Sequence, residues 1–192
     1  MKVIYTGESH ELESTLPKIF LAGPSPRPGV LKPSWRPEAI KILKELGFDG
    51  IVYDPEYSTG GFFDATDEDA YLAQGEWEDT GLEAADCIVF WVPTDSKEYL
   101  GLTTRIEFGE HYDCARTSEG KKRVVYGRPK YAWRTKAFDR KWKKETGGEP
   151  CQYLFDTLHR ALLELEWAGR WMNPDGSVHA KLSPDDADVV RE

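Results

Sequence analysis

The sequence predicts a three-layer α/β fold built on a parallel sheet of about five strands. The segment Cys87-Ile88-Val89-Phe90-Trp91-Val92 is apolar at every position, which is typical of a strand buried on both faces of a parallel sheet. Short apolar segments alternate with amphipathic helical segments along most of the chain, and this alternation is typical of strands joined by helical crossovers. Together these two observations favour helices on both faces of one sheet.

Five short segments are predicted to be strands. They are residues 3–5, as an edge strand, 18–22, 51–53, 87–92 and 123–126. The second ends at Gly23-Pro24 and the third at Asp54-Pro55, which are typical chain-turning pairs. Short connections and right-handed crossovers then limit the topology to a flavodoxin-like or Rossmann-like winding.

Four helical segments are predicted between and after these strands. Their expected ranges are from Ser34, as the N-cap, to Gly47, as the stop; from about residue 69 to 85; from about 103 to 115; and from about 153 to 168. In the second of them, the side chains expected to pack are Leu72, Trp77, Leu82 and Ala85. Residues 1–192 form one domain, and we expect the tail from about residue 173 to be mobile.

Composition excludes several classes of protein. The net charge is −9 and the pI is about 5.1, which argues against binding to a nucleic-acid polymer. No run of 18 apolar residues predicts a membrane span, and the first residues lack the apolar run of a signal peptide, so we expect a cytoplasmic protein. Three separated cysteines and four isolated histidines indicate free thiols, no metal site and no cofactor.

The predicted ligand site lies beyond the carboxyl ends of the strands. Three loops meet there, at residues 23–33, 54–69 and 93–104, and the helix that begins near Thr103 points its N-terminus at the same crevice. Glu107 stands between Ile106 and Phe108 in the first turns of that helix. We expect the two apolar residues to anchor the helix while Glu107 faces a partly dehydrated pocket, kept ionised by the helix N-terminus and the hydroxyls of Thr103 and Thr104.

Four motifs in the expected order carry a resemblance. They are Ile19-Phe20-Leu21-Ala22-Gly23-Pro24-Ser25, then Trp77-Glu78 with Leu82 and Ala85-Asp86, then Phe90-Trp91-Val92-Pro93, then Thr103-Thr104-Arg105-Ile106-Glu107-Phe108-Gly109. Over roughly residues 18 to 128 this pattern resembles the nucleoside 2-deoxyribosyltransferase family. The common nucleotide-binding fingerprints are absent.

The resemblance implies an enzyme that transfers 2-deoxyribose between nucleobases through a covalent intermediate, with retention of configuration. It implies Glu107 as the nucleophile and Glu78, eight positions before Asp86, as the orienting or proton-donating carboxylate. The implied substrates are a deoxynucleoside or deoxynucleotide and a free base. The resemblance also implies a homo-oligomer, a dimer or larger, in which neighbouring subunits complete each site.

Further residues are candidate substrate contacts. They are Phe20, Gly23, Pro24, Ser25, Arg27, Trp91, Thr103 and Thr104. Ser25 and Arg27 suit a 5′-hydroxyl or 5′-phosphate, and Trp91, with Trp35, Phe62 and Phe63, offers a ring for stacking on a base, although a core position is the commoner role of such rings. Phe20 replaces a tyrosine of several family members, and the acidic residue that some members have before the nucleophile lacks a clear equivalent.

Two alternatives stay open. If water reaches the intermediate before a base does, the same site is an N-glycoside hydrolase acting on a 2′-deoxynucleoside or its 5′-monophosphate. A nucleotide-binding protein without catalysis is the third interpretation. The basic segment of residues 130–144 suits either a phosphate or, more simply, a solvated helix face.

Overall fold

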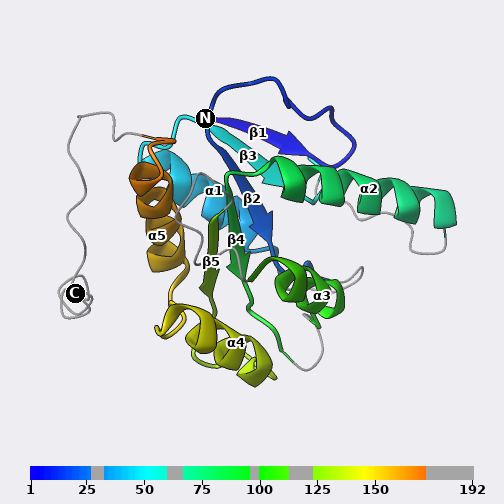
Figure 1. The fold of residues 1–192 in the computed structure, drawn as a ribbon. Coiled ribbons are helices and arrows are strands. Elements are labelled where there is room, and N and C mark those ends of the chain that lie inside the picture. Colours follow the sequence, from blue (N-terminus) through cyan, green and yellow to red (C-terminus); the bar gives the residue numbers. More distant parts are fainter. Residues whose placement is uncertain (27–32, 60–66, 96–99, 113–122, 172–192) are drawn as a thin grey trace.

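The computed structural model describes residues 1–26, 33–59, 67–95, 100–112 and 123–171. In these residues five strands form one sheet in the order β1-β3-β2-β4-β5, and every pair is parallel (Figure 1). The strands are β1 (Lys2–Tyr5), β2 (Lys18–Ala22), β3 (Ile51–Asp54), β4 (Cys87–Trp91) and β5 (Arg123–Gly127). The predicted parallel sheet and its edge strand are therefore confirmed.

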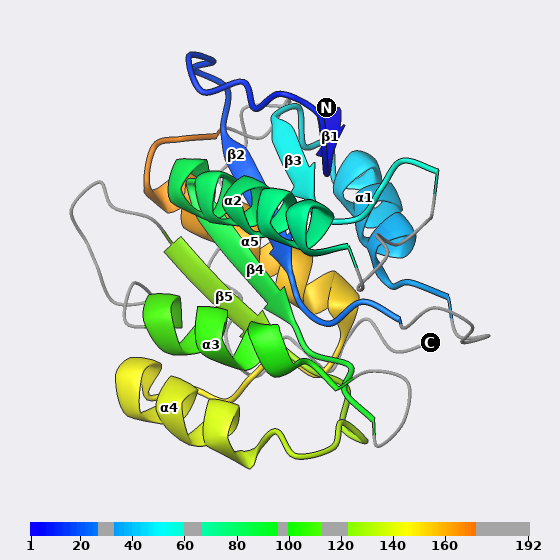
Figure 2. The ribbon, with the colours of Figure 1, turned by 90° about the vertical axis from the view of Figure 1, so that its right-hand side faces the viewer.

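Within the described ranges, five helices cover the two faces of the sheet. They are α1 (Arg36–Glu45), α2 (Glu68–Ala84), α3 (Leu102–His111), α4 (Lys136–Thr146) and α5 (Leu154–Trp167). Figure 2 shows α2 and α3 in front of the sheet, with α4 beside α3, and α1 and α5 behind it. Alternate residues of β4 serve the two sides, since Val89 packs in the cluster with α1 and α5, whereas Phe90 packs in the cluster with α2, α3 and α4. This is the predicted three-layer fold.

The winding places a crevice between β2 and β4. The chain runs from β2 through α1 to β3 on one side of β2, and then through α2 to β4 on the other side. Loops that leave β2 and β4 therefore diverge at the carboxyl edge of the sheet, which is where ligands bind in open α/β folds.

Helix α1 begins and ends close to the predicted residues. It starts at Arg36, and the Ser34 hydroxyl accepts a hydrogen bond from the Arg36 N–H at 3.1 Å. Gly47 follows the helix with a φ of 78°, a left-handed conformation that glycine adopts without strain. The predicted stop is confirmed, and Trp35 rather than Ser34 occupies the N-cap position.

Two expected packing residues are exposed instead. Leu72 is 54% exposed, because α2 buries the face that carries Trp77. Each residue turns an α-helix by about 100°, so Leu72, five residues before Trp77, points well away from that face. Ile106 is 64% exposed, while Phe108 is buried, because residues two apart point to different sides of a helix. The predicted anchoring role of Ile106 is therefore wrong, and only Phe108 anchors α3.

The remaining helices follow the chain pattern. Within α4, which contains much of the basic segment of residues 130–144, Phe138 is the one buried residue, so most of this helix faces solvent. The helix predicted from about residue 153 to 168 is confirmed, and the side of α5 that carries Leu158, Leu162 and Leu165 packs on the sheet. In the described part of the chain, no helix is long and apolar enough to cross a membrane.

Candidate active site

A cavity of about 570 Å³ opens at the carboxyl edge of the sheet, beside the crevice between β2 and β4. Its walls come from the end of β2 and the loop after it, from residues 71–79 of α2, and from α3 with the two residues before it. Arg36 and Pro55 also line it. Among the predicted site residues, it brings together Phe20, Gly23, Pro24, Ser25, Glu78, Thr103 and Glu107.

Gly23 lets the loop after β2 pass close to β4. Its φ is 151°, and a Cβ atom at this position would lie 2.2 Å from the backbone oxygen of Trp91. No side chain fits there unless the backbone of β4 or of the loop moves. Gly23 therefore sets the position of Pro24 and Ser25, both of which line the cavity.

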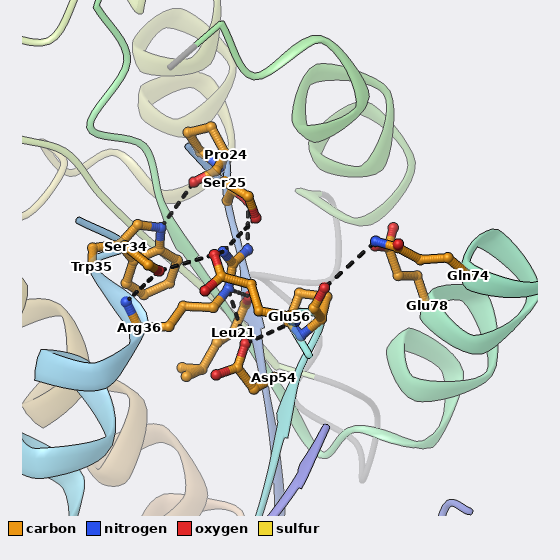
Figure 3. Close-up of polar contacts among 12 residues, drawn as sticks. Leu21, Pro24, Ser25, Ser34, Trp35, Arg36, Asp54, Glu56, Gln74 and Glu78 are labelled. Carbon is orange, nitrogen blue, oxygen red and sulfur yellow. Dashed lines mark hydrogen bonds and ion pairs between the residues drawn. The ribbon is translucent and has the colours of Figure 1, made fainter. Parts of the chain in front are cut away.

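Arg36 ties this loop to the neighbouring strand end. Its side chain is 1% exposed, and its guanidinium donates to the backbone oxygens of Leu21 at 3.1 Å and Gly23 at 2.6 Å (Figure 3). The same group donates to the Ser25 hydroxyl at 2.8 Å and to the Glu56 carboxylate at 2.7 Å. One buried guanidinium thus joins the ends of β2 and β3, as its planar set of five donors allows.

Sequence reasoning missed Arg36, although one sequence feature points to it. Arg36, Ala39 and Leu43 are spaced i, i+3 and i+7, which places them on one face of α1, and that face is the buried one. A charged residue on a buried helix face needs partners, and here they are the carboxylates of Asp54, at the end of β3, and Glu56, just after it. Burial raises the pKa of Asp54 to about 6, against the attraction of Arg36, whose Nε lies 3.6 Å from an Asp54 oxygen.

Glu78 of α2 and Glu107 of α3 reach the cavity from two different helices, and both are partly buried. Burial raises the pKa of Glu107 to about 8, and repulsion from Glu78 is the second cause, followed by the opposing attraction of Arg36. At neutral pH Glu107 therefore carries a proton in most molecules of the free protein. The expectation that the helix N-terminus keeps it ionised is wrong, because Glu107 is the sixth residue of α3 and the dipole acts mainly within the first turn.

Glu78 has a defined partner. Gln74, one turn earlier on α2, donates from its amide nitrogen to Glu78 Oε1 at 2.7 Å. Burial raises the pKa of Glu78, while the Gln74 hydrogen bond and the Arg36 charge act against that rise. Two carboxyl groups in one cavity that repel each other tend to share one proton, and this is the charge state that a nucleophile and an acid need together.

Other predicted residues lie away from the cavity. Trp91 is buried in the core on the α1 and α5 side of the sheet, and Thr104 is 1% exposed; neither lines the cavity. Arg27, Phe62 and Phe63 lie outside the described residues. The Trp35 indole donates to the Pro24 backbone oxygen at 3.1 Å and packs in the core, so it supports the loop rather than offering a free ring.

Asp86 has a structural role at the opposite end of β4. Its carboxylate accepts a hydrogen bond from the Lys18 N–H at 2.9 Å and another from the Arg170 guanidinium at 2.6 Å. These contacts join the starts of β2 and β4 to Arg170, in the segment just after α5. Asp86 therefore lies outside the cavity, which Glu78 lines.

A family of known proteins matches the part of the chain that builds this cavity. The family described as nucleoside 2-deoxyribosyltransferase like matches residues 16–131, which is more than half of the chain. The chain belongs to this family. The match runs from the segment just before β2 to the segment after β5, and it contains Arg36, Glu78 and Glu107. In this nucleoside 2-deoxyribosyltransferase-like protein, α4 and α5 lie beyond the matched region. A comparison with curated proteins found no match.

Proposed function

We propose that this protein transfers 2-deoxyribose from one nucleobase to another through a covalent deoxyribosyl-glutamate on Glu107. The observation that carries the proposal is the pairing of two electrostatically coupled carboxyl groups, Glu78 and Glu107, in one cavity of a chain that belongs to this family. Enzymes that cleave a glycosidic bond with retention commonly use two carboxyl groups whose pKa values differ.

In the first half of the reaction, a carboxylate oxygen of Glu107 bonds to C1′ of the bound deoxynucleoside. The bond between C1′ and the base nitrogen breaks, its electron pair stays with the base, and Glu78 delivers a proton to the base. In the second half, a nitrogen of the incoming base bonds to C1′, the Glu107 ester bond breaks, and the proton of that base returns to Glu78. Two inversions at C1′ give net retention.

The proton shared by the pair suits this cycle. In the free protein burial and the charge of Glu78 raise the pKa of Glu107 to about 8, which favours its protonated form. Attack requires Glu107 to be ionised, so binding of the donor must move the proton toward Glu78 and the leaving base. The guanidinium of Arg36 lowers the free energy of the ionised forms of both carboxyl groups, so it opposes the presence of a second proton on the pair.

The charge of the cavity favours a neutral deoxynucleoside over a 5′-monophosphate. Its described walls carry four carboxyl groups, from Glu78, Asp79, Glu107 and Glu110, and a single cation, Arg36. Arg36 already pairs with Asp54 and Glu56. A phosphate dianion would meet net negative charge there, whereas the hydroxyl groups of a nucleoside can hydrogen-bond to carboxylates.

One incubation separates the possible activities. The chain is mixed with deoxyinosine and a second free base such as adenine, and the products are separated by chromatography. We expect the exchanged deoxynucleoside. Free deoxyribose as the main product would favour the hydrolase. Recovery of unchanged substrates, with this and every other combination of donor nucleoside and acceptor base, would contradict catalysis.

A further inference from the structure

Gln74 lines the cavity beside Glu78, and the two ends of its amide have different surroundings. Gln74 and Glu78 are four residues apart on α2, so their side chains lie one above the other on the same face of the helix (Figure 3). The Gln74 amide nitrogen is 2.7 Å from Glu78 Oε1 and 3.5 Å from the backbone oxygen of Pro55, at the end of β3. Both neighbours of that nitrogen are acceptors.

These neighbours fix which end of the amide is nitrogen. If the amide were rotated by 180°, its oxygen would face a carboxyl oxygen and a carbonyl oxygen at these distances, and the ionised carboxylate would then lose its donor. The amide oxygen therefore points the other way. In the described part of the chain it is buried and has no hydrogen-bond partner, and Gln74 itself lines the cavity.

A buried acceptor without a donor is rare in folded proteins and usually marks a position that a ligand or another group completes. The neighbouring titratable groups do not supply that donor. Asp79 on α2 and Glu107 and Glu110 on α3 also carry carboxyl groups, and no described hydrogen bond joins any of them to the Gln74 oxygen. Arg36, from α1, donates to the loop after β2 and to Glu56.

We propose that Gln74 is a positioning residue of this site, whose amide N–H holds the Glu78 carboxyl in one orientation and whose amide oxygen accepts a hydrogen bond from an N–H or O–H group of the bound nucleoside. This inference rests on the proposed function. The same amide would thus orient the Glu78 carboxyl and accept a hydrogen bond from the bound substrate.

The test compares Gln74→Met, which keeps the length of the side chain and removes both hydrogen bonds, with Gln74→Glu, which keeps acceptor oxygens and removes the donor. Gln152, the other glutamine of the chain, is exposed and lies outside the cavity, so Gln152→Met is the matched control. Thermal unfolding verifies that each variant is folded. Two measurements follow, one without substrate and one with it.

Without substrate, the titration of the Glu78 carboxyl carbon is followed by NMR, with the resonance assigned from its loss in Glu78→Gln. Gln74 donates to the ionised form, so its removal should raise the Glu78 midpoint by about one pH unit, a tenfold change in the dissociation constant. We expect the rise in both Gln74 variants, larger in Gln74→Glu because of the added charge, and no change in Gln152→Met. An unchanged midpoint in both Gln74 variants overturns the proposal.

With substrate, kcat and KM are measured across pH for transfer from deoxyinosine to adenine. In Gln74→Met we expect kcat to fall and KM to rise, each by about tenfold, and the acidic limb of the kcat/KM profile to move to higher pH together with the Glu78 midpoint. A pH profile with unchanged limbs, or wild-type kcat and KM, overturns the positioning role. If the wild-type chain shows no turnover, the proposed function fails, and the substrate-free titration still decides whether Gln74 controls the Glu78 carboxyl.

Discussion

Glu78 of α2 and Glu107 of α3 face one cavity, and the charge on Glu78 is, after burial itself, the largest cause of the raised pKa of Glu107. The two residues are 29 positions apart in the chain and belong to different helices. The sheet brings them together because α2 precedes β4 and α3 follows it on the same face. Their coupling makes the pair, rather than either residue alone, the group that titrates.

The stability of the protein should depend on pH through Glu107. Its pKa is about 8 in the folded chain, against an ordinary value of 4.5, so the folded state holds this proton more tightly than the unfolded state. The resulting destabilisation is absent below about pH 4.5, grows as pH rises toward 8, and is constant above it. Thermal unfolding of Glu107→Gln should therefore show a gain in Tm over the wild type that is larger at pH 8 than at pH 5.

The control for this experiment is Glu83→Gln, an exposed position on α2 outside the cavity. It should differ from the wild type by the same small amount at both pH values. A Tm gain for Glu107→Gln that stays constant between pH 5 and pH 8 would show that Glu107 titrates normally in the folded chain.

Replacement of the candidate acid should change both the proton affinity of the nucleophile and the rate. In Glu78→Gln the repelling charge is gone, so the pKa of Glu107 should fall below its wild-type value, as measured by NMR titration. Transfer from a deoxynucleoside whose base must be protonated should slow by about 10²- to 10⁴-fold, the usual contribution of a general acid. The rate of transfer from a donor whose base leaves without protonation should fall much less. Equal losses for both donors would assign Glu78 a role other than proton transfer.

Removal of the Arg36 guanidinium should lower the free energy of unfolding. Arg36→Met leaves Asp54 and Glu56 without their buried counter-charge, and breaking a buried ion pair typically costs about 3–5 kcal/mol of unfolding free energy. Arg140→Met, at an exposed position of α4, should stay within about 0.5 kcal/mol of the wild type. Chemical denaturation measures both, and a loss of less than about 1 kcal/mol in Arg36→Met would contradict the network described here.

The chain is predicted to form a homo-oligomer with the cavity mouth near the interface. Tyr71 and Leu72 of α2 and Leu102 and Ile106 of α3 are between 53% and 65% exposed, and three of these four line the cavity. Exposed large apolar side chains gathered around one opening are typical of a surface that another chain covers. Light scattering should give at least twice the chain mass of 21.9 kDa.

Leu72→Lys should lower that mass toward a single chain. Leu12→Lys, at a similarly exposed leucine of the segment before β2, should leave it unchanged. A particle of 21.9 kDa that stays fully active on dilution would show that one chain holds every group the reaction needs.

Much of the fold could be predicted because the strands are visible in the sequence as apolar runs. Segments such as residues 87–92 admit few other structures, and glycine and proline mark their ends. Errors arose on the helices, where the buried face depends on which neighbour the helix meets. Leu72 and Ile106 are apolar, yet they lie on faces of α2 and α3 that the sheet does not cover in this chain.

The site could be predicted in part. Glu107 and Glu78 followed from motif positions and from the rule that ligands bind at the carboxyl edge of the sheet. Arg36 and Gln74 were missed because their importance lies in contacts with backbone oxygens of other segments, Leu21 and Gly23 for the arginine and Pro55 for the glutamine. A pattern of side chains along the chain does not encode where a distant carbonyl group will point.

The most direct test of the central claim is to trap the intermediate. The chain is incubated with a 2-fluoro deoxynucleoside analogue, which slows release of the sugar, then digested and examined by mass spectrometry. We predict a fluorodeoxyribosyl adduct on the peptide that contains Glu107, at Glu107 itself, and no adduct in Glu107→Gln. An adduct on a different residue, or base exchange at the wild-type rate by Glu107→Ala, would contradict the assignment of Glu107 as the nucleophile.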